Sequence, residues 1–185
     1  MDIKKLADVK DRFADYEKIF NSGDYDKAAD ILSAILERIE ECTDERKAGT
    51  MDDTFVKKSD MDGRPIYISL NHVMEYYVYA CYFEPETDVL CTELPVGEYY
   101  RTYGSLCQKL SKFRRAEDAF KKAICWNPVD LVSYLGLAEC YKNLNMLSRY
   151  LDVTKQAYRF CCSRATMARY YRNMGFYYVA RYNTE

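Results

Sequence analysis

The sequence has little of what metal centres and active sites are built from. His72 is its only histidine, and no Cys-x-x-Cys pair occurs. The chain also has no glycine loop that could cradle phosphate, no Gly-x-Ser-x-Gly motif and no His-Glu-x-x-His motif. A structural zinc ion needs four Cys or His ligands at characteristic spacings. We therefore expect a protein that is not an enzyme and that binds no cofactor or metal.

The residues that could still carry such chemistry have simpler interpretations. His72 falls in an expected helix among aromatic residues, where a structural role is favoured over that of a general base. Four aspartates between positions 52 and 62 lack the glutamate that closes a calcium-binding loop. We interpret them as a solvated run of charge.

Long apolar segments are also missing. No stretch reaches the ~18 uninterrupted apolar residues that a membrane span needs, and the first six residues lack the apolar core of a secretory signal. Of the eight cysteines, Cys107, Cys125 and Cys140 fall at helix positions where small apolar residues are expected. We predict a cytoplasmic protein without a membrane partner, in which all thiols are free. Alkylation of the unreduced, denatured protein should then label all eight cysteines.

What the sequence does contain is a pattern that recurs after 34 residues, between Gly97 and Cys162. The first copy reads Tyr100-x2-Tyr103-Gly104-x2-Cys107, then Phe113-x2-Ala116-x3-Phe120-x2-Ala123, and closes with Trp126-Asn127-Pro128. The matching positions of the second copy are Tyr134, Leu137, Ala138, Tyr141, Leu147, Tyr150, Thr154 and Ala157. Each copy is typical of two antiparallel helices joined by a tight turn, because residues three and four apart share one helix face.

This pattern resembles the tetratricopeptide repeat, a 34-residue unit that begins with aromatic-x2-Leu-Gly-x2-Tyr and later has Ala-x3-Phe and a proline. The resemblance is clear over about 97–181 and weaker over 9–42, and the second copy departs from the family at Tyr150, Thr154 and Cys162. Units of this family stack side by side. The resemblance therefore implies an all-α fold, a right-handed α-α superhelix of antiparallel helix pairs. An ordinary helical bundle would explain the helices but not the 34-residue recurrence.

We expect one helical-repeat domain over 1–185. Its parts are a divergent N-terminal repeat (1–42), a long polar loop (43–68), an aromatic helix with its connector (69–96), two repeats (97–162) and an unpaired C-terminal helix (165–185). Helices are predicted near 3–20, 24–41, 69–83, 98–110, 113–126, 130–143, 147–160 and 165–181. The helix that begins at Ser69 is almost wholly apolar or aromatic, so we expect it in the centre of the fold with Ser69 as its N-cap.

Two further expectations concern the repeats. Phe120 should be nearly fully buried in the space that Gly104 leaves between two helices. The last helix carries the first-helix signature once more, as Tyr171-x2-Met174-Gly175-x2-Tyr178, yet has no partner helix after it.

The charge of the chain is divided between its halves. Residues 1–98 carry 23 acids and 12 bases, whereas residues 99–185 carry 15 bases and 6 acids. An acidic front and a basic back are compatible with head-to-tail association of copies.

The resemblance also implies a ligand surface. In the family, the first helices of successive repeats line a groove that binds extended peptides. The peptide contacts expected on this basis are Arg101, Ser105, Gln108, Leu135, Glu139, Lys142, Arg169, Arg172, Asn173 and Phe176. Some members clamp a terminal carboxylate there, but Ser105 and Gly136 replace two asparagines of that clamp.

The alternative interpretation of this surface is a solvated helix face. Convergence of Arg101, Lys142, Arg169 and Arg172 on one wall would favour a peptide groove. Scatter of these arginines on the convex side, or pairing of the cations with Glu98 and Glu139 so as to fill the groove, would refute it.

Three functions follow, in order of preference. The first is a non-enzymatic interaction module, a scaffold that binds an acidic or C-terminal peptide of a protein partner. The second is a homo-oligomeric structural solenoid or a fragment of a longer repeat protein. The third is RNA binding through the basic, tyrosine-rich C-terminal half. Nucleic acid ranks last because the tyrosines recur at core spacing and the sequence pI is about 5.6.

Overall fold

A computed structural model describes residues 9–42, 66–85 and 88–182, and these are mostly helical. The helices are α1 (Val9–Asn21), α2 (Tyr25–Cys42), α3 (Val73–Phe83), α4 (Val96–Lys109), α5 (Phe113–Trp126), α6 (Leu131–Asn143), α7 (Leu147–Ala157) and α8 (Arg164–Tyr182), with a 3-10 turn, η2 (Tyr158–Phe160), after α7. The all-α prediction is confirmed at this level. None of the described helices is long and apolar enough to cross a membrane.

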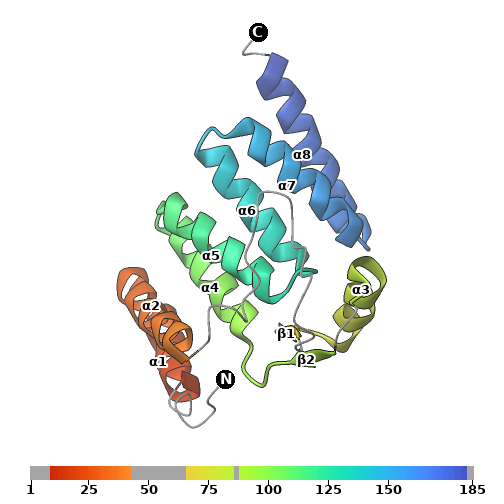
Figure 1. Ribbon diagram of the computed structural model, residues 1–185. Coiled ribbons are helices and arrows are strands. Elements are labelled where there is room, and N and C mark those ends of the chain that lie inside the picture. The colour runs from red at the N-terminus through yellow and green to blue at the C-terminus, as the bar shows by residue number, and fades with distance from the viewer. Residues whose placement is uncertain (1–8, 43–65, 86–87, 183–185) are drawn as a thin grey trace.

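Consecutive helices pair into hairpins. α1 packs on α2, α4 on α5 and α6 on α7, and α8 then packs on α7. Contacts between α2 and α4 and between α5 and α6 join the hairpins in a row, which Figure 1 shows running from α1 and α2 at one end to α8 at the other. Helices α2 and α4 to α8 lie within three residues of the predicted ranges, since the apolar spacing that defines them is local. For the first predicted helix, 3–20, α1 matches the described part, and residues 3–8 lie outside the described residues.

One ring holds the middle of this row together. Phe120 of α5 is 1% exposed, as predicted, and its ring lies against two glycines. A methyl group added at Gly104 of α4 would come within 3.0 Å of the ring, and one added at Gly136 of α6 within 2.4 Å. Both helices approach α5 this closely because neither carries a side chain at the contact.

A small insertion separates α2 from α4. Strands β1 (Ile66–Ile68) and β2 (Val89–Cys91) form a parallel pair, with Tyr67 opposite Leu90, and α3 connects them. The sequence predicted no strands here and placed 66–68 in a loop, which is wrong for those residues. The rest of that loop, 43–65, lies outside the described residues.

The predicted central position of α3 is also wrong. Tyr79 is its only buried residue, whereas Val73 and Met74 are 78% and 70% exposed. The helix begins at Val73, so His72 lies at the N-cap position with an exposed side chain rather than among aromatics inside the helix.

Ser69 has a different role from the predicted N-cap. It is buried, and its hydroxyl oxygen accepts a hydrogen bond from the Gly97 amide at 3.1 Å. Its own amide donates to the Trp126 carbonyl at 2.8 Å. Ser69 therefore anchors the insertion to the start of α4 and the end of α5.

Candidate functional site

The residues predicted to contact a peptide lie on α4, α6 and α8, and side-chain contacts connect these helices. Gln108 of α4 donates to the Gly136 carbonyl of α6 at 2.7 Å. Lys142 of α6 places its Nζ 4.9 Å from the ring centre of Phe176 on α8. The predicted contact residues thus lie on α4, α6 and α8, and side chains link α4 to α6 and α6 to α8.

The guanidinium group of Arg101 binds carboxylates of its own chain. Its guanidinium donates to the Asp130 carboxylate at 3.3 Å and to Glu98 at 3.4 Å, and its side chain is 20% exposed. Asp130 is buried at the N-cap of α6, where it also accepts from the Val132 amide and the Ser133 hydroxyl. Arg101 neutralises this carboxylate and ties α4 to the start of α6.

Three other predicted contacts are occupied or inaccessible. The Ser105 hydroxyl is exposed but donates to the Arg101 carbonyl, one turn back in α4. Gln108 also donates to the Cys140 sulfur at 3.2 Å. Leu135 is only 4% exposed, so its prediction as an exposed groove residue is wrong. Leu135 belongs to the core because α6 lies between neighbouring helices and has little free surface.

On α6, the lysine is paired as well. Lys142 donates to Glu139 at 3.2 Å, and Glu139 also accepts a bond from Asn143 at 3.3 Å. The remaining cation-π contact of Lys142 with Phe176 links α6 to α8.

The last helix carries the exposed part of the predicted site. Arg169 and Arg172 are exposed, and no ion pair among the described residues includes either of them. Phe176 is 39% exposed and packs edge-on against Tyr150 of α7, with ring centres 5.5 Å apart. The Tyr150 hydroxyl donates to the Asn173 carbonyl at 3.0 Å. α8 contains four arginines and no acidic residue.

The four predicted cations therefore divide into two pairs. Arg101 and Lys142 are bound to carboxylates of their own chain, including Glu98 and Glu139, so the pairing that argues against a peptide groove is observed for these two cations. Arg169 and Arg172 face solvent from a helix that offers them no counter-charge. The candidate site is reduced to the α8 end of the predicted wall.

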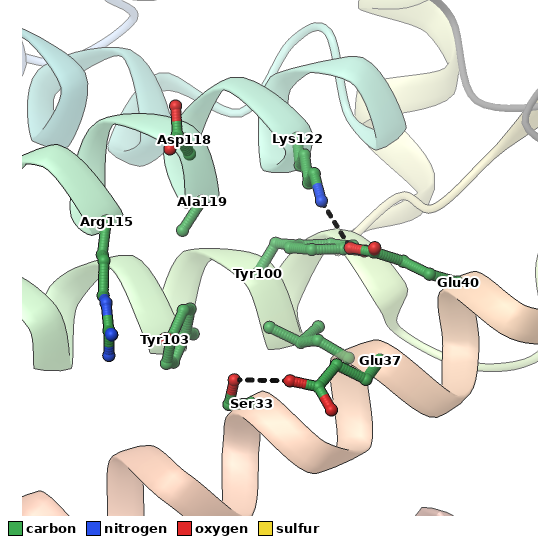
Figure 2. A pocket seen from close by; sticks show the side chains of 10 residues that line it. Ser33, Glu37, Glu40, Tyr100, Tyr103, Arg115, Asp118, Ala119 and Lys122 are labelled. Carbon is green, nitrogen blue, oxygen red and sulfur yellow. Dashed lines mark hydrogen bonds and ion pairs between the residues drawn. The ribbon is translucent and has the colours of Figure 1, made fainter.

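A polar cleft of about 320 Å³ between α2, α4 and α5 was not predicted. Figure 2 shows Tyr100 and Lys122 directed at Glu40 across it. The Tyr100 hydroxyl donates to the Glu40 carboxylate at 2.7 Å, and Lys122 forms an ion pair with the same carboxylate. Burial alone would raise the pKa of Glu40, but the bonds from Lys122 and Tyr100 lower it overall. Burial and Glu40 together raise the pKa of Tyr100.

Contacts across this cleft join acidic residues of the first half of the chain to basic residues of the second half. Lys112, at the N-cap position of α5, also pairs with Asp26 of α2, at 2.7 Å. The acidic α2 is thus joined to the basic α5 within one chain. The halves of opposite charge were visible in the sequence, but the Tyr100–Glu40 pair spans 60 positions and has no local signal.

The buried cysteines Cys107 and Cys140 are poor candidates for a reactive thiol. None of the seven cysteines whose side chains are described forms a disulfide bond. Burial raises the pKa of the Cys107 thiol and raises that of Cys140 to about 11, which disfavours the nucleophilic thiolate. No group of three or more His, Cys, Asp or Glu side chains within the described ranges could hold a metal ion.

Comparison with known proteins assigns no function to this arrangement. No family model, no curated protein and no solved structure matches the chain.

Proposed function

We propose that this chain is a tetratricopeptide-like, non-enzymatic interaction module that binds an extended acidic peptide of a partner protein at α8. The observation that supports this proposal is the pair of exposed arginines, Arg169 and Arg172, beside Phe176 on a helix without acids. A guanidinium forms bidentate, charge-assisted hydrogen bonds with carboxylates. The half-exposed ring supplies the apolar contact that binding sites combine with a few polar groups.

The internal pairing of Arg101 and Lys142 limits the proposed surface. Each would have to leave a carboxylate to bind a ligand, and Asp130 would then remain buried with an unpaired charge. We therefore assign recognition to Arg169, Arg172 and Phe176.

The position of Phe120 also favours acidic side chains over a terminal carboxylate as the ligand. The clamp for a terminal carboxylate needs an asparagine where this chain has Gly136. The Phe120 ring lies 2.4 Å from where any Cβ at that position would stand. An asparagine cannot be accommodated there unless the Phe120 ring moves.

Fluorescence anisotropy can test the proposal with a labelled peptide of alternating glutamate and leucine and with its glutamine counterpart. We expect the glutamate peptide to bind more tightly than the glutamine peptide, and its affinity to fall with added salt. The double variant Arg169→Glu/Arg172→Glu should lose at least tenfold in affinity with unchanged helical circular dichroism.

The control variant is Lys10→Glu/Lys27→Glu, which reverses two exposed charges on α1 and α2. It changes the net charge by the same amount and should keep the wild-type affinity. Equal losses in both double variants would mean that only the overall charge matters, and the assignment to α8 would be wrong.

A further inference from the structure

A second surface of α8 is distinct from the one just described. Arg164, Ala168, Tyr171, Gly175, Tyr178 and Tyr182 follow one another at alternating intervals of four and three residues, so they form one line along the helix. All six are exposed, with Tyr171 at 60%, Tyr178 at 59% and Tyr182 at 81%. We call this line the open stripe.

In the other hairpins, the residues at positions equivalent to those of the open stripe are buried. By the repeat pattern, Tyr171, Gly175 and Tyr178 correspond to Tyr100, Gly104 and Cys107 of α4. Those three are buried, and Gly104 receives the Phe120 ring of α5.

The corresponding residues of α6 are buried too. Tyr134, Ala138 and Tyr141 are 2%, 0% and 5% exposed in the hairpin with α7. At Gly175, by contrast, an added methyl group would meet no atom within 4 Å. The open stripe therefore consists of the positions that a neighbouring helix covers in α4 and α6, and no helix among the described residues covers it in α8.

The charge of α8 indicates which charge a helix that packs on the open stripe should carry. Four arginines and no acid lie on α8, and Arg164 belongs to the stripe itself. A second copy of α8 would place arginines opposite arginines, which is repulsive. A helix with acidic flanks would be attracted instead.

We propose that the open stripe binds an acidic amphipathic helix of a partner protein, with an aromatic side chain inserted over Gly175 as Phe120 is inserted over Gly104. The contact follows the helix-in-groove mode, in which anchors spaced by three and four residues enter one apolar face. Tyr171 and Tyr178 flank the aromatic anchor, and Arg164 pairs with a carboxylate. This inference goes beyond the proposed peptide site, which lies on the side of α8 that carries Phe176.

A probe for this site can be derived from α5. It is the segment Phe113–Trp126 with glutamate at the four cationic positions and alanine in place of Cys125. A second peptide has alanine in place of Phe120 as well. By calorimetry, the first peptide should bind the wild-type chain saturably, and loss of the phenylalanine should weaken binding at least tenfold.

The matched protein variants are Gly175→Leu and Ala34→Leu. Both place a leucine side chain at an exposed helix position, but only Gly175→Leu fills the space for the aromatic anchor. We expect Gly175→Leu to weaken the probe at least tenfold, Ala34→Leu to leave it unchanged, and Arg164→Glu to weaken it in low salt. Binding of the extended glutamate–leucine peptide should not change with Gly175→Leu, so the two proposals fail separately.

Four results would overturn the inference. One is no saturable binding of the probe up to about 1 mM, and another is binding that Gly175→Leu does not affect. The third is self-association of the wild type in sedimentation experiments, if Gly175→Leu abolishes that self-association. This result would assign the stripe to a second copy of the chain. The fourth is preferential, Gly175→Leu-sensitive binding of a labelled oligouridylate of about 12 nucleotides, which would assign it to nucleic acid.

Discussion

α4 and α8 carry the same signature but differ in how they are packed. In α4, Tyr100 is 3% exposed and Gly104 lies under the Phe120 ring. In α8, the equivalent Tyr171 is 60% exposed and Gly175 has free space beside it. The difference arises because α4 lies between α2, α5 and α6, whereas α8 packs mainly on α7. Positions that carry the same signature are therefore buried or exposed according to the helices that pack around them.

α8 is also attached to the rest of the chain through fewer buried residues than α4. No residue of α8 is buried, whereas α4 has seven buried residues. The hydrogen bond from Tyr150 to Asn173 and the contacts of Phe176 with Tyr150 and Lys142 hold α8 on α7 and α6. Five substitutions, with Tyr171→Ala as a control, test this contrast.

The largest effect is expected at the ring that α4, α5 and α6 share. Phe120→Ala should lower the free energy of unfolding by about 3–5 kcal/mol, since it removes a fully buried ring and leaves a cavity. Urea denaturation followed by circular dichroism measures this. Tyr171→Ala on the exposed stripe is the control and should change stability by less than about 0.5 kcal/mol.

Adding a side chain at either glycine that contacts the Phe120 ring should lower the stability of the chain through overpacking. Gly136→Ala should cost about 1–3 kcal/mol, because the added methyl group would stand 2.4 Å from Phe120. Gly104→Leu should be at least as damaging, since a larger side chain enters the same contact. A wild-type melting temperature for both variants would contradict the observed packing around Phe120.

The link between α7 and α8 should be sensitive to pH. Burial foremost, and then Glu139, raise the pKa of Tyr150 from 10.0 to about 12, against a smaller lowering by Arg172. The unfolded state loses this proton first, so Tyr150 contributes stability below pH 10 that disappears as the pH rises towards 12.

Tyr150→Phe removes both the hydrogen bond and the ionisation. It should cost roughly 0.5–1.5 kcal/mol at pH 8 and should show a smaller loss of stability than the wild type between pH 8 and 11. An equal loss in both proteins would mean that Tyr150 does not contribute to the alkaline change.

The smallest effect is expected at Gly175 and has the opposite sign. Gly175→Ala should stabilise the chain by roughly 0.5–1 kcal/mol, because alanine favours a helix and nothing obstructs its methyl group. Differential scanning calorimetry of Gly175→Ala beside Gly136→Ala gives the comparison directly. Destabilisation by both would show that α8 is covered in solution.

The candidate site could be predicted only in part. The sequence selected residues of α4, α6 and α8 because residues three and four apart share a face, and the structure does connect those helices. It could not show that Arg101 is bound by Asp130, which lies 29 positions away on another helix. Leu135 was wrongly expected to be exposed, since exposure depends on the helices packed around it.

The local elements were largely determined by the sequence. The positions of α1, α2 and α4 to α8 follow from apolar spacing and turn residues, which act within a few positions. Phe120 was expected to be buried because its pattern pairs it with small residues on the same seam.

Tertiary structure alone decided the rest. β1 and β2 are three residues each and exist only because they pair with one another across α3. The apolar α3 is exposed and the signature stripe of α8 is open, although their sequences favour burial. Hydrophobicity makes burial favourable, but a side chain becomes buried only where another element packs on it.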